Sequence, residues 1–140
     1  MSHYFDASAL VPMLIHESKS AVIDTLMQSL GERPTVSDFA AGEVASALAR
    51  LVRIGAMTAQ VAQNRLTDFD AWRAGDTQAI EMLNMDVAQA AVFVRQFDLG
   101  LRMPDALHLA IAQRSGLPLI TLDERMAKAG ATLGVQTVKL

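Results

Sequence analysis

The sequence predicts an α/β fold: a three-layer sandwich in which helices flank a mostly parallel central sheet of four to five strands. Short runs of β-branched and aromatic residues alternate with longer segments of helical periodicity, which is the pattern of such folds. One short run, residues 119–121, lies among further apolar residues, as is typical of a strand buried in a parallel sheet. The 140 residues fit one domain, residues 1–140.

The chain begins with a short aromatic strand, predicted at residues 3–5, and two helices follow it. Ser8 can cap the first helix, and Pro12 then falls in or just after its first turn, where backbone N–H groups are free. The second helix is predicted over residues 18–30, because apolar residues recur there at helical spacing and Gly31 can end it.

A second strand is predicted at residues 34–36, and it too is followed by two helices. Ser37 or Asp38 can cap the first of them, which ends near residue 54 before a glycine. Thr58 can cap the second, whose apolar positions continue to about residue 74.

The C-terminal half continues the same alternation. The remaining strands are predicted at residues 79–83, 119–121 and 135–140. One helix opens at Asn84 or Asp86 and reaches about residue 97. A second begins at Pro104, a residue favoured at the first helical position, continues over residues 106–114 and ends at Gly116. A short helix after Asp123 reaches about residue 133.

The composition excludes several classes of protein. With 51% hydrophobic and 19% charged residues the chain can build a packed core, so it is not a disordered protein. The absence of cysteine excludes a disulfide scaffold, a thiolate zinc site and a thiol nucleophile. We find no apolar run long enough to span a membrane and no signal peptide, so we expect a cytoplasmic protein without membrane contact.

Four acidic residues fall near the predicted carboxyl ends of strands or in the helices that follow. They are Asp6, Glu43, Asp105 and Asp123. In a parallel sheet the carboxyl ends of the strands point the same way, and ligands bind beyond them. Carboxylates gathered there would repel one another unless cations lie between them. Their hard oxygen ligands suit Mg²⁺ or Mn²⁺, ions that assist phosphoryl displacement.

Each acid also has a purely structural interpretation. An aspartate at a helix N-terminus, such as Asp105, Asp6 or Asp123, is commonly a cap or a partner of the helix dipole. Glu43 is harder to explain in that way, because it lies among alanine, glycine and valine with few charged residues near it in the sequence.

Four segments, in order, resemble the motifs of the PIN-domain family. They are residues 6–11 (DASALV), 41–48 (AGEVASAL), 101–110 (LRMPDALHLA) and 119–123 (LITLD). Each motif alone is weakly specific, but four in the right order span essentially the whole chain. Within the family the chain most resembles the small bacterial VapC-type toxins, which implies a PIN-like fold.

The resemblance implies an endoribonuclease that depends on Mg²⁺ or Mn²⁺, the toxin of a type II toxin–antitoxin pair. It also implies a homodimer and a VapB-type antitoxin partner. By position, Asp6 and Asp105 would be the main metal ligands. Glu43 and Asp123 would complete the catalytic cluster by binding a second ion or orienting water.

Residues near these acids are weaker candidates. Ser8 could bind a metal-bound water, although helix capping is the preferred role. Arg102 and Arg125 could hold substrate phosphates or simply face solvent. His108, three residues after Asp105, could act as a base, but a structural histidine is favoured.

Two other functions remain open. One is a non-catalytic binding module with the same fold. The other is a phosphohydrolase with Asp6 as nucleophile, which is disfavoured because such enzymes usually have a second aspartate where Ser8 stands.

The net charge of −3 at first argues against a nucleic-acid partner. Without the four candidate ligands, however, 12 basic residues face 11 acidic ones. The negative balance therefore belongs largely to the predicted metal site. A mean hydropathy of +0.25 is high for a monomer of this size and favours a dimer, with residues 26–30 and 48–54 as candidate contacts.

Overall fold

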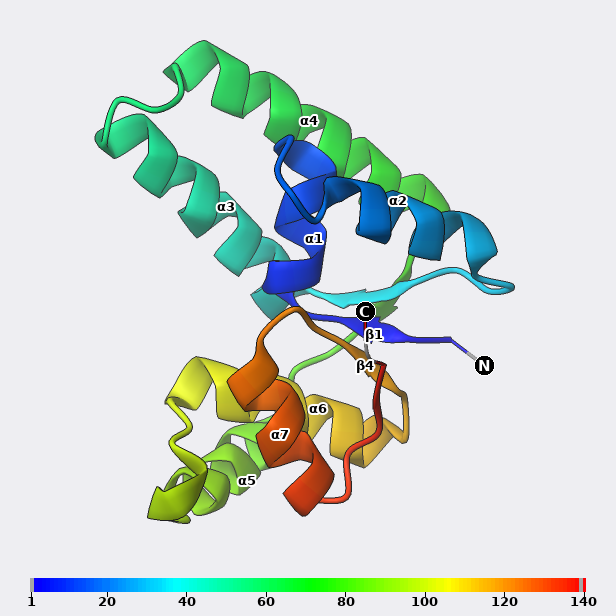
Figure 1. The fold of residues 1–140 in the computed structure, drawn as a ribbon, viewed down its shortest axis with the longest axis vertical. Coiled ribbons are helices and arrows are strands. Elements are labelled where there is room, and N and C mark those ends of the chain that lie inside the picture. Colours follow the sequence, from blue (N-terminus) through cyan, green and yellow to red (C-terminus); the bar gives the residue numbers. More distant parts are fainter. Residues whose placement is uncertain (1, 139) are drawn as a thin grey trace.

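The computed structural model describes residues 2–138 and residue 140. Twelve strands and α-helices and one 3₁₀ helix follow one another in these residues (Figure 1). In chain order they are β1 (Tyr4–Phe5), α1 (Ala7–Leu14), α2 (Ser20–Ser29), β2 (Thr35–Ser37), α3 (Asp38–Arg53), α4 (Ala59–Asp76), β3 (Gln78–Ile80), α5 (Asn84–Val94), η1 (Phe97–Leu99), α6 (Met103–Ser115), β4 (Leu119–Ile120), α7 (Glu124–Thr132) and β5 (Thr137–Val138).

The sheet has five strands in the order β3-β2-β1-β4-β5, and all neighbouring strands are parallel. The chain builds outward from β1 to β3, then returns to the other side of β1 to place β4. The strand order therefore reverses between β1 and β4. In open parallel sheets the crevice beyond the carboxyl ends at such a point is where ligands bind.

The central strands β1 and β4 are short and buried on both faces. Tyr4 packs into the core on one side of the sheet and Phe5 into the core on the other. Leu119 and Ile120 divide between the two cores in the same way, as the two-residue period of a strand requires. None of these four side chains is exposed, so β1 and β4 have no hydrophilic face, whereas the edge strand β3 is partly exposed.

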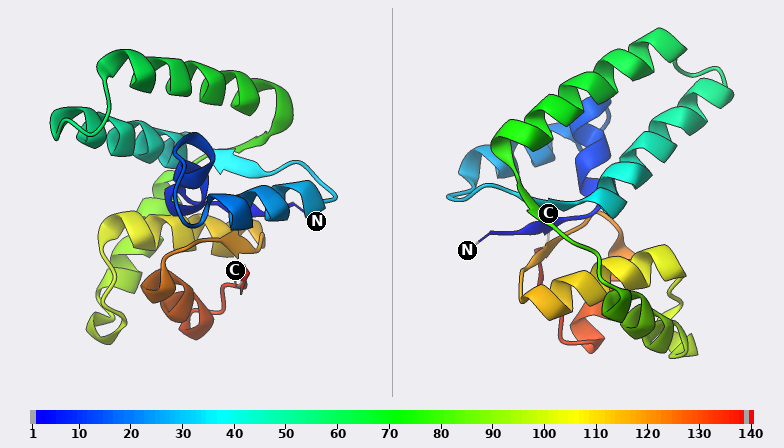
Figure 2. Two further views of the ribbon diagram at one scale, coloured as in Figure 1. Left: turned by 45° about the horizontal axis from the view of Figure 1, so that its top comes forward. Right: turned by 180° about the vertical axis from the view of Figure 1, so that it is seen from behind.

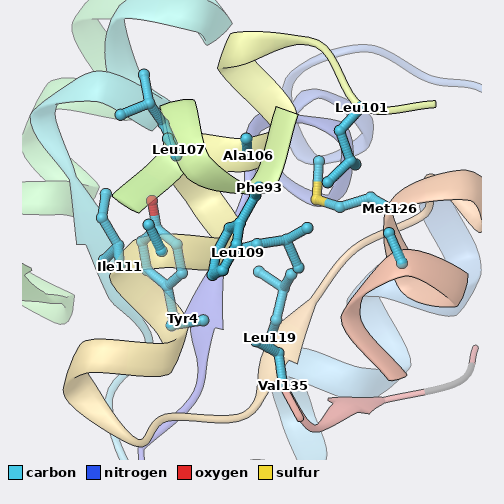
Figure 3. Packing of buried hydrophobic residues seen from close by; sticks show 14 residues of the cluster. Tyr4, Phe93, Leu101, Ala106, Leu107, Leu109, Ile111, Leu119, Met126 and Val135 are labelled. Carbon is cyan, nitrogen blue, oxygen red and sulfur yellow. The ribbon is translucent and has the colours of Figure 1, made fainter. Parts of the chain in front are cut away.

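Helices cover both faces of the sheet, which confirms the predicted three-layer α/β fold. Helices α1 to α4 lie on one face and α5 to α7 on the other (Figures 1 and 2). Figure 3 shows the core beneath α5 to α7, where Tyr4 and Leu119 of the sheet meet Phe93, Leu109 and Met126 of the helices. None of the helices described is long and apolar enough to cross a membrane.

Several predicted boundaries are corrected by the structure. The helix predicted to reach residue 97 ends at Val94, because η1 follows and Gly100 turns the chain with a φ of 64°. Its N-cap is Leu83, and Asp86 lies in its first turn. The last strand is Thr137–Val138 only, and Lys139 of the predicted strand lies outside the described residues.

The prolines also sit deeper in their helices than predicted. Pro104 is the second residue of α6, which starts at Met103. Pro12 is the sixth residue of α1 and lies in its second turn, not in or just after the first turn. Since proline has no N–H, it cannot donate to the carbonyl of Ser8, so α1 lacks one helical hydrogen bond. Pro12 is buried, so the packing of its ring in the core offsets part of the loss of this hydrogen bond.

Candidate active site

Asp6 directly follows the central strand β1, at the point where the strand order reverses. Asp6 is only 2% exposed. One carboxylate oxygen, Oδ2, accepts a hydrogen bond from Thr121 Oγ1 at 2.6 Å. The other, Oδ1, accepts from Ser8 Oγ at 2.7 Å and from the Ala9 N–H at 3.1 Å. Asp6 therefore caps α1 and also faces the loop after β4.

The prediction that Ser8 caps the first helix is wrong. The helix begins at Ala7, so Asp6 occupies the capping position and Ser8 lies in the first turn. The Ser8 hydroxyl donates to Asp6 and accepts from the Leu122 N–H at 2.9 Å. Ser8 thus ties the carboxyl end of β1 to the loop that follows β4.

Burial raises the pKa of Asp6 above its ordinary value. The hydrogen bonds from Thr121, Ser8 and Ala9 oppose this shift without cancelling it. The three hydrogen-bond donors are neutral, so they orient the carboxylate but supply no full positive charge. A cation placed against Asp6 would therefore stabilise its ionised form.

Asp123 is the N-cap of α7. Its Oδ1 accepts from the Met126 N–H at 3.0 Å, and its own N–H donates to Thr121 Oγ1 at 3.0 Å. Asp123 and Thr121 also line a pocket of about 410 Å³ beside the carboxyl ends of β4 and β5, with Lys19 on the same rim. The predicted cap is present, and the carboxylate borders a space that a ligand can enter.

Glu43 has few charged neighbours in the sequence, but it has a hydrogen-bond partner on another helix. It lies in the second turn of α3, and its Oε1 forms a hydrogen bond with Nε2 of His108 on α6. Nδ1 of His108 lies 2.7 Å from the hydroxyl of Tyr4. The favoured structural role of His108 is thus combined with a direct contact to one of the four candidate acids.

Asp105 lies one turn before His108 in the first turn of α6 and is 9% exposed. Its Oδ2 accepts from the Arg102 N–H at 3.4 Å, so part of its role is the structural one of a capping box. The Arg102 guanidinium approaches the same oxygen at 3.7 Å. These contacts are weak, and the Asp105 side chain keeps 13% of its surface exposed.

The two candidate phosphate-binding arginines lie on the surface near these acids. The Arg102 side chain is 79% exposed. Arg125 is an exposed residue in the first turn of α7, two positions after Asp123. A phosphate role for either side chain stays a prediction.

Three of the four acids take part in two separate hydrogen-bonded groups. Asp6 and Asp123 share Thr121, while Glu43 is joined to His108, one helical turn from Asp105. Among the described residues, no three acidic or histidine side chains are close enough together to form a metal site on their own.

This arrangement fits a magnesium-type ion better than a zinc-type ion. Mg²⁺ commonly takes only one or two carboxylates and completes its coordination with water and phosphate oxygens. A zinc site would need three or four protein ligands held close together, with histidine or cysteine among them. Carboxylates and hydroxyls from several separate elements are therefore a suitable donor set for Mg²⁺ or Mn²⁺.

Three residues of this network were not identified from the sequence. Thr121 follows a buried strand directly, and a polar residue at that position could have been recognised as a site candidate. Tyr4 and Ser37 looked like strand and cap residues, and no local pattern predicts their contact with His108.

Comparison with known proteins identifies the family. The family model described as the PIN domain matches residues 3–131. The chain belongs to the PIN-domain family. This match confirms the PIN-domain resemblance that the four motif segments indicate.

Relatives within the PIN-domain family include two ribonucleases of Mycobacterium tuberculosis. Ribonuclease VapC3 is 34% identical over 129 residues, which cover 89% of this chain and 84% of that protein. Ribonuclease VapC46 is 32% identical over 142 residues, with 96% and 95% of the two chains covered.

Solved structures show the same fold. The crystal structure of Mycobacterium tuberculosis VapC20, a toxin that cleaves the sarcin–ricin loop, superposes with a TM-score of 0.74 at 17% identity. The match covers 92% of this PIN-domain chain and 95% of VapC20. VapBC2 from Rickettsia felis, solved with a promoter DNA fragment, gives a TM-score of 0.71 at 10% identity over 100% and 99% of the chains.

Proposed function

We propose that this protein is an endoribonuclease that cleaves RNA phosphodiester bonds with the help of Mg²⁺ or Mn²⁺, as the toxin of a type II toxin–antitoxin pair. The observation that carries the proposal is the buried carboxylate of Asp6 at the reversal of strand order, oriented by three neutral donors. The relatives named ribonuclease support RNA as the substrate.

Asp6 and Asp105 are the residues proposed to hold the main ion, with Glu43 and Asp123 binding a second ion or orienting water. A bound divalent ion supplies positive charge to the phosphate and lowers the pKa of a water molecule. Thr121 and Ser8 orient Asp6, and the pocket beside Asp123 leaves room for part of the RNA chain. Arg102 and Arg125 are the candidate contacts to flanking phosphates.

We further propose that the chain acts as a single PIN-like domain of residues 1–140, as a homodimer, and with a VapB-type antitoxin. Solved VapBC complexes with the same fold, such as that of Haemophilus influenzae, support the antitoxin as the partner. Cleavage of cellular RNA would place the protein in the cytoplasm.

The alternatives have less support. A phosphohydrolase with Asp6 as covalent nucleophile would need a second acid near it to protonate the leaving group. The structure places the Ser8 hydroxyl there, and this hydroxyl donates to Asp6. A non-catalytic PIN module would have no need to keep Asp6 and Asp105 as buried carboxylates.

The test is an assay of RNA cleavage by the purified chain on a panel of structured RNAs. We expect Mg²⁺ or Mn²⁺ to support cleavage, EDTA to abolish it and Asp105→Asn to abolish it with the fold retained, as judged by circular dichroism. Cleavage that resists both chelator and Asp105→Asn would contradict the proposal. Binding of Mn²⁺ without cleavage of any RNA would favour the non-catalytic module.

A further inference from the structure

A row of four polar side chains runs through the core from the end of β2 to Glu43. Glu43 belongs to what we call the acidic edge, the carboxyl end of the sheet with the neighbouring helix turns that carry Asp6, Glu43, Asp105 and Asp123. Ser37 Oγ lies 2.9 Å from the Tyr4 hydroxyl, and that hydroxyl lies 2.7 Å from His108 Nδ1. His108 Nε2 then meets Glu43 Oε1. Tyr4 and Ser37 are fully buried, and His108 is 2% exposed.

Hydrogen-bond accounting gives this row a direction. Ser37 Oγ accepts from the Ala40 N–H, so its own hydrogen is free to donate to Tyr4. Tyr4 can then donate to Nδ1 of His108, which leaves the hydrogen of a neutral His108 on Nε2, where it donates to Glu43. Every polar hydrogen then has an acceptor, as buried groups require.

The opposite direction satisfies fewer groups. If His108 carried its hydrogen on Nδ1, Tyr4 would have to accept it and donate to Ser37. The hydrogen of Ser37 would then find no acceptor among its recorded contacts, and Nε2 would face the Glu43 carboxylate without a hydrogen.

The imidazole ring is held in place as well as hydrogen-bonded. Its centroid lies 5.2 Å from that of Phe39 and 5.7 Å from that of Tyr4, both in tilted contacts. A buried ring with two aromatic neighbours and two hydrogen bonds has little freedom to rotate. The position of Nε2 is therefore fixed by the core, not by solvent.

The row also joins the elements that carry three of the acids. Tyr4 lies two residues before Asp6, Ser37 is the N-cap of the helix that carries Glu43, and His108 lies one turn after Asp105. Of the four members only Glu43, with its side chain 32% exposed, reaches the surface. The three buried members therefore fix the place at which the Glu43 carboxylate finds its hydrogen-bond donor.

We propose that His108 is a positioning residue: its Nε2–H, oriented by Tyr4 and Ser37, holds the Glu43 carboxylate in the place needed at the acidic edge. The inference rests on the proposed metal-dependent function of that edge and deepens it. It assigns to Tyr4, Ser37 and His108 a shared role that neither the sequence motifs nor the relatives specify.

Two substitutions of His108 separate positioning from mere core packing. In His108→Gln the amide nitrogen can replace Nε2 and still donate to Glu43. In His108→Asn the amide is too short to reach Glu43 but can still meet Tyr4. Ile111→Val, a buried change on the same helix in the core of Figure 3, is the control for lost stability.

Each variant is assayed for RNA cleavage, for binding of Mn²⁺ alone by calorimetry, and for thermal stability. We expect His108→Asn to lose about 10- to 100-fold in cleavage or Mn²⁺ affinity, as is usual when a group that orients a metal ligand is removed. His108→Gln should recover most of that loss. Equal losses in the two variants, or an equal loss in Ile111→Val, would overturn the proposal.

A measurement without metal or RNA tests the geometry separately. Nitrogen-15 NMR of the histidine side chains should show His108 in the Nε2–H form, and Tyr4→Phe should shift its Nδ1 resonance. A His108 in the Nδ1–H form would overturn the proposal whether or not the protein cleaves RNA. If the wild type shows the expected form but cleaves no RNA, the proposed function fails while the arrangement of Glu43 stands.

Discussion

The carboxylate of Asp6 is buried at the end of β1, and its hydrogen-bond donors are all neutral. Burial disfavours its ionised form, as the raised pKa shows. Folding the chain therefore places a charge where the protein alone does not stabilise it fully. A divalent cation bound at this edge would offset that cost, because its positive charge would stabilise the ionised carboxylate of Asp6.

Replacing Asp6 with asparagine should separate these two effects. Asp6→Asn removes the buried charge and keeps an oxygen that can accept from Ser8 and Ala9, while its amide can donate to the Thr121 hydroxyl, so we expect the metal-free variant to melt at the same or a higher temperature than the wild type at pH 7. Cleavage and Mn²⁺-induced stabilisation should both be lost. Differential scanning calorimetry with and without Mn²⁺ measures this, and a metal-free variant that melts well below the wild type would contradict the argument.

Thr121 supplies the shortest recorded hydrogen bond to Asp6, and it also accepts from the Asp123 N–H. Thr121→Val keeps the shape but leaves two buried polar groups without this partner. We expect a loss of about 1–3 kcal/mol in the free energy of unfolding, measured with urea, and a loss of cleavage. Thr121→Ser, which keeps the hydroxyl, should retain most of both. Equal behaviour of the two variants would show that the hydroxyl is unimportant.

Helices α5 and α6 are joined by an ion pair near their ends, at a distance from the acidic edge. The Arg114 guanidinium donates to both oxygens of the buried Asp86, at 2.7 Å and 3.0 Å, and to the Glu81 carbonyl at 2.7 Å. Asp86 also accepts from the Leu83 N–H at 2.8 Å. The pair thereby fixes the loop between β3 and α5 against α6.

This pair should contribute stability that depends on pH. Burial opposes ionisation of Asp86, but the bonds from Arg114 and Leu83 outweigh it and hold the pKa of Asp86 below its ordinary value. Its contribution is therefore complete above about pH 4 and is lost as the pH falls through the lowered pKa. We expect Arg114→Met to cost up to about 3 kcal/mol at pH 7.

Urea unfolding of Arg114→Met and wild type between pH 7 and pH 3 tests that expectation. The difference between the two proteins should be largest near neutral pH and shrink in acid. Arg114→Lys, which keeps the charge without the two-pronged geometry, should fall between them. A difference that does not change with pH would show that packing, not the ion pair, sets the effect.

The elements that were predictable from sequence are those whose signals are local. Thr58 and Ser37 cap their helices as predicted, because the preference for such residues at helix starts comes from bonds within four residues. The start of α1 was misplaced because Asp6 and Ser8 can both cap, and the choice depends on the loop after β4. Local preference cannot decide between them.

The acids of the site could be named from motifs, but their partners could not. Glu43 and His108 are 65 positions apart, and Asp6 and Thr121 are 115 apart. Such contacts exist only after the sheet has assembled, so no window of the sequence contains them. The same applies to Arg102 and Arg125, whose exposure depends on how α6 and α7 pack.

At the scale of the whole molecule, most of the leucines in the predicted dimer contacts are not exposed on the surface. Leu26 and Leu30 pack against the core and Leu48 is fully buried, whereas Ile54 is 61% exposed. Other exposed apolar side chains lie on α5 and η1, with Met85 at 62%, Val92 at 53% and Phe97 at 86%. A second copy of the chain would gain free energy by covering such side chains.

We therefore expect a dimer mass in light scattering at micromolar concentration and a shift toward the monomer in Phe97→Asp. Ile54→Asp is the matched variant for the region predicted from the sequence, and it should change the mass less. A wild type that is monomeric at these concentrations would contradict the proposed homodimer. A larger effect of Ile54→Asp would return the contact to the end of α3.

The pairing of β1 with β4 has a consequence for the timing of synthesis. Tyr4 pairs with Leu119 and Asp6 receives its bond from Thr121, so the first and last motifs are 115 residues apart when the ribosome makes them. Domains fold as they leave the ribosome at about 5–20 residues per second. Until residue 123 has left the ribosome, a nascent chain cannot complete the acidic edge that we propose cleaves RNA. It therefore cannot cleave the mRNA from which it is being translated.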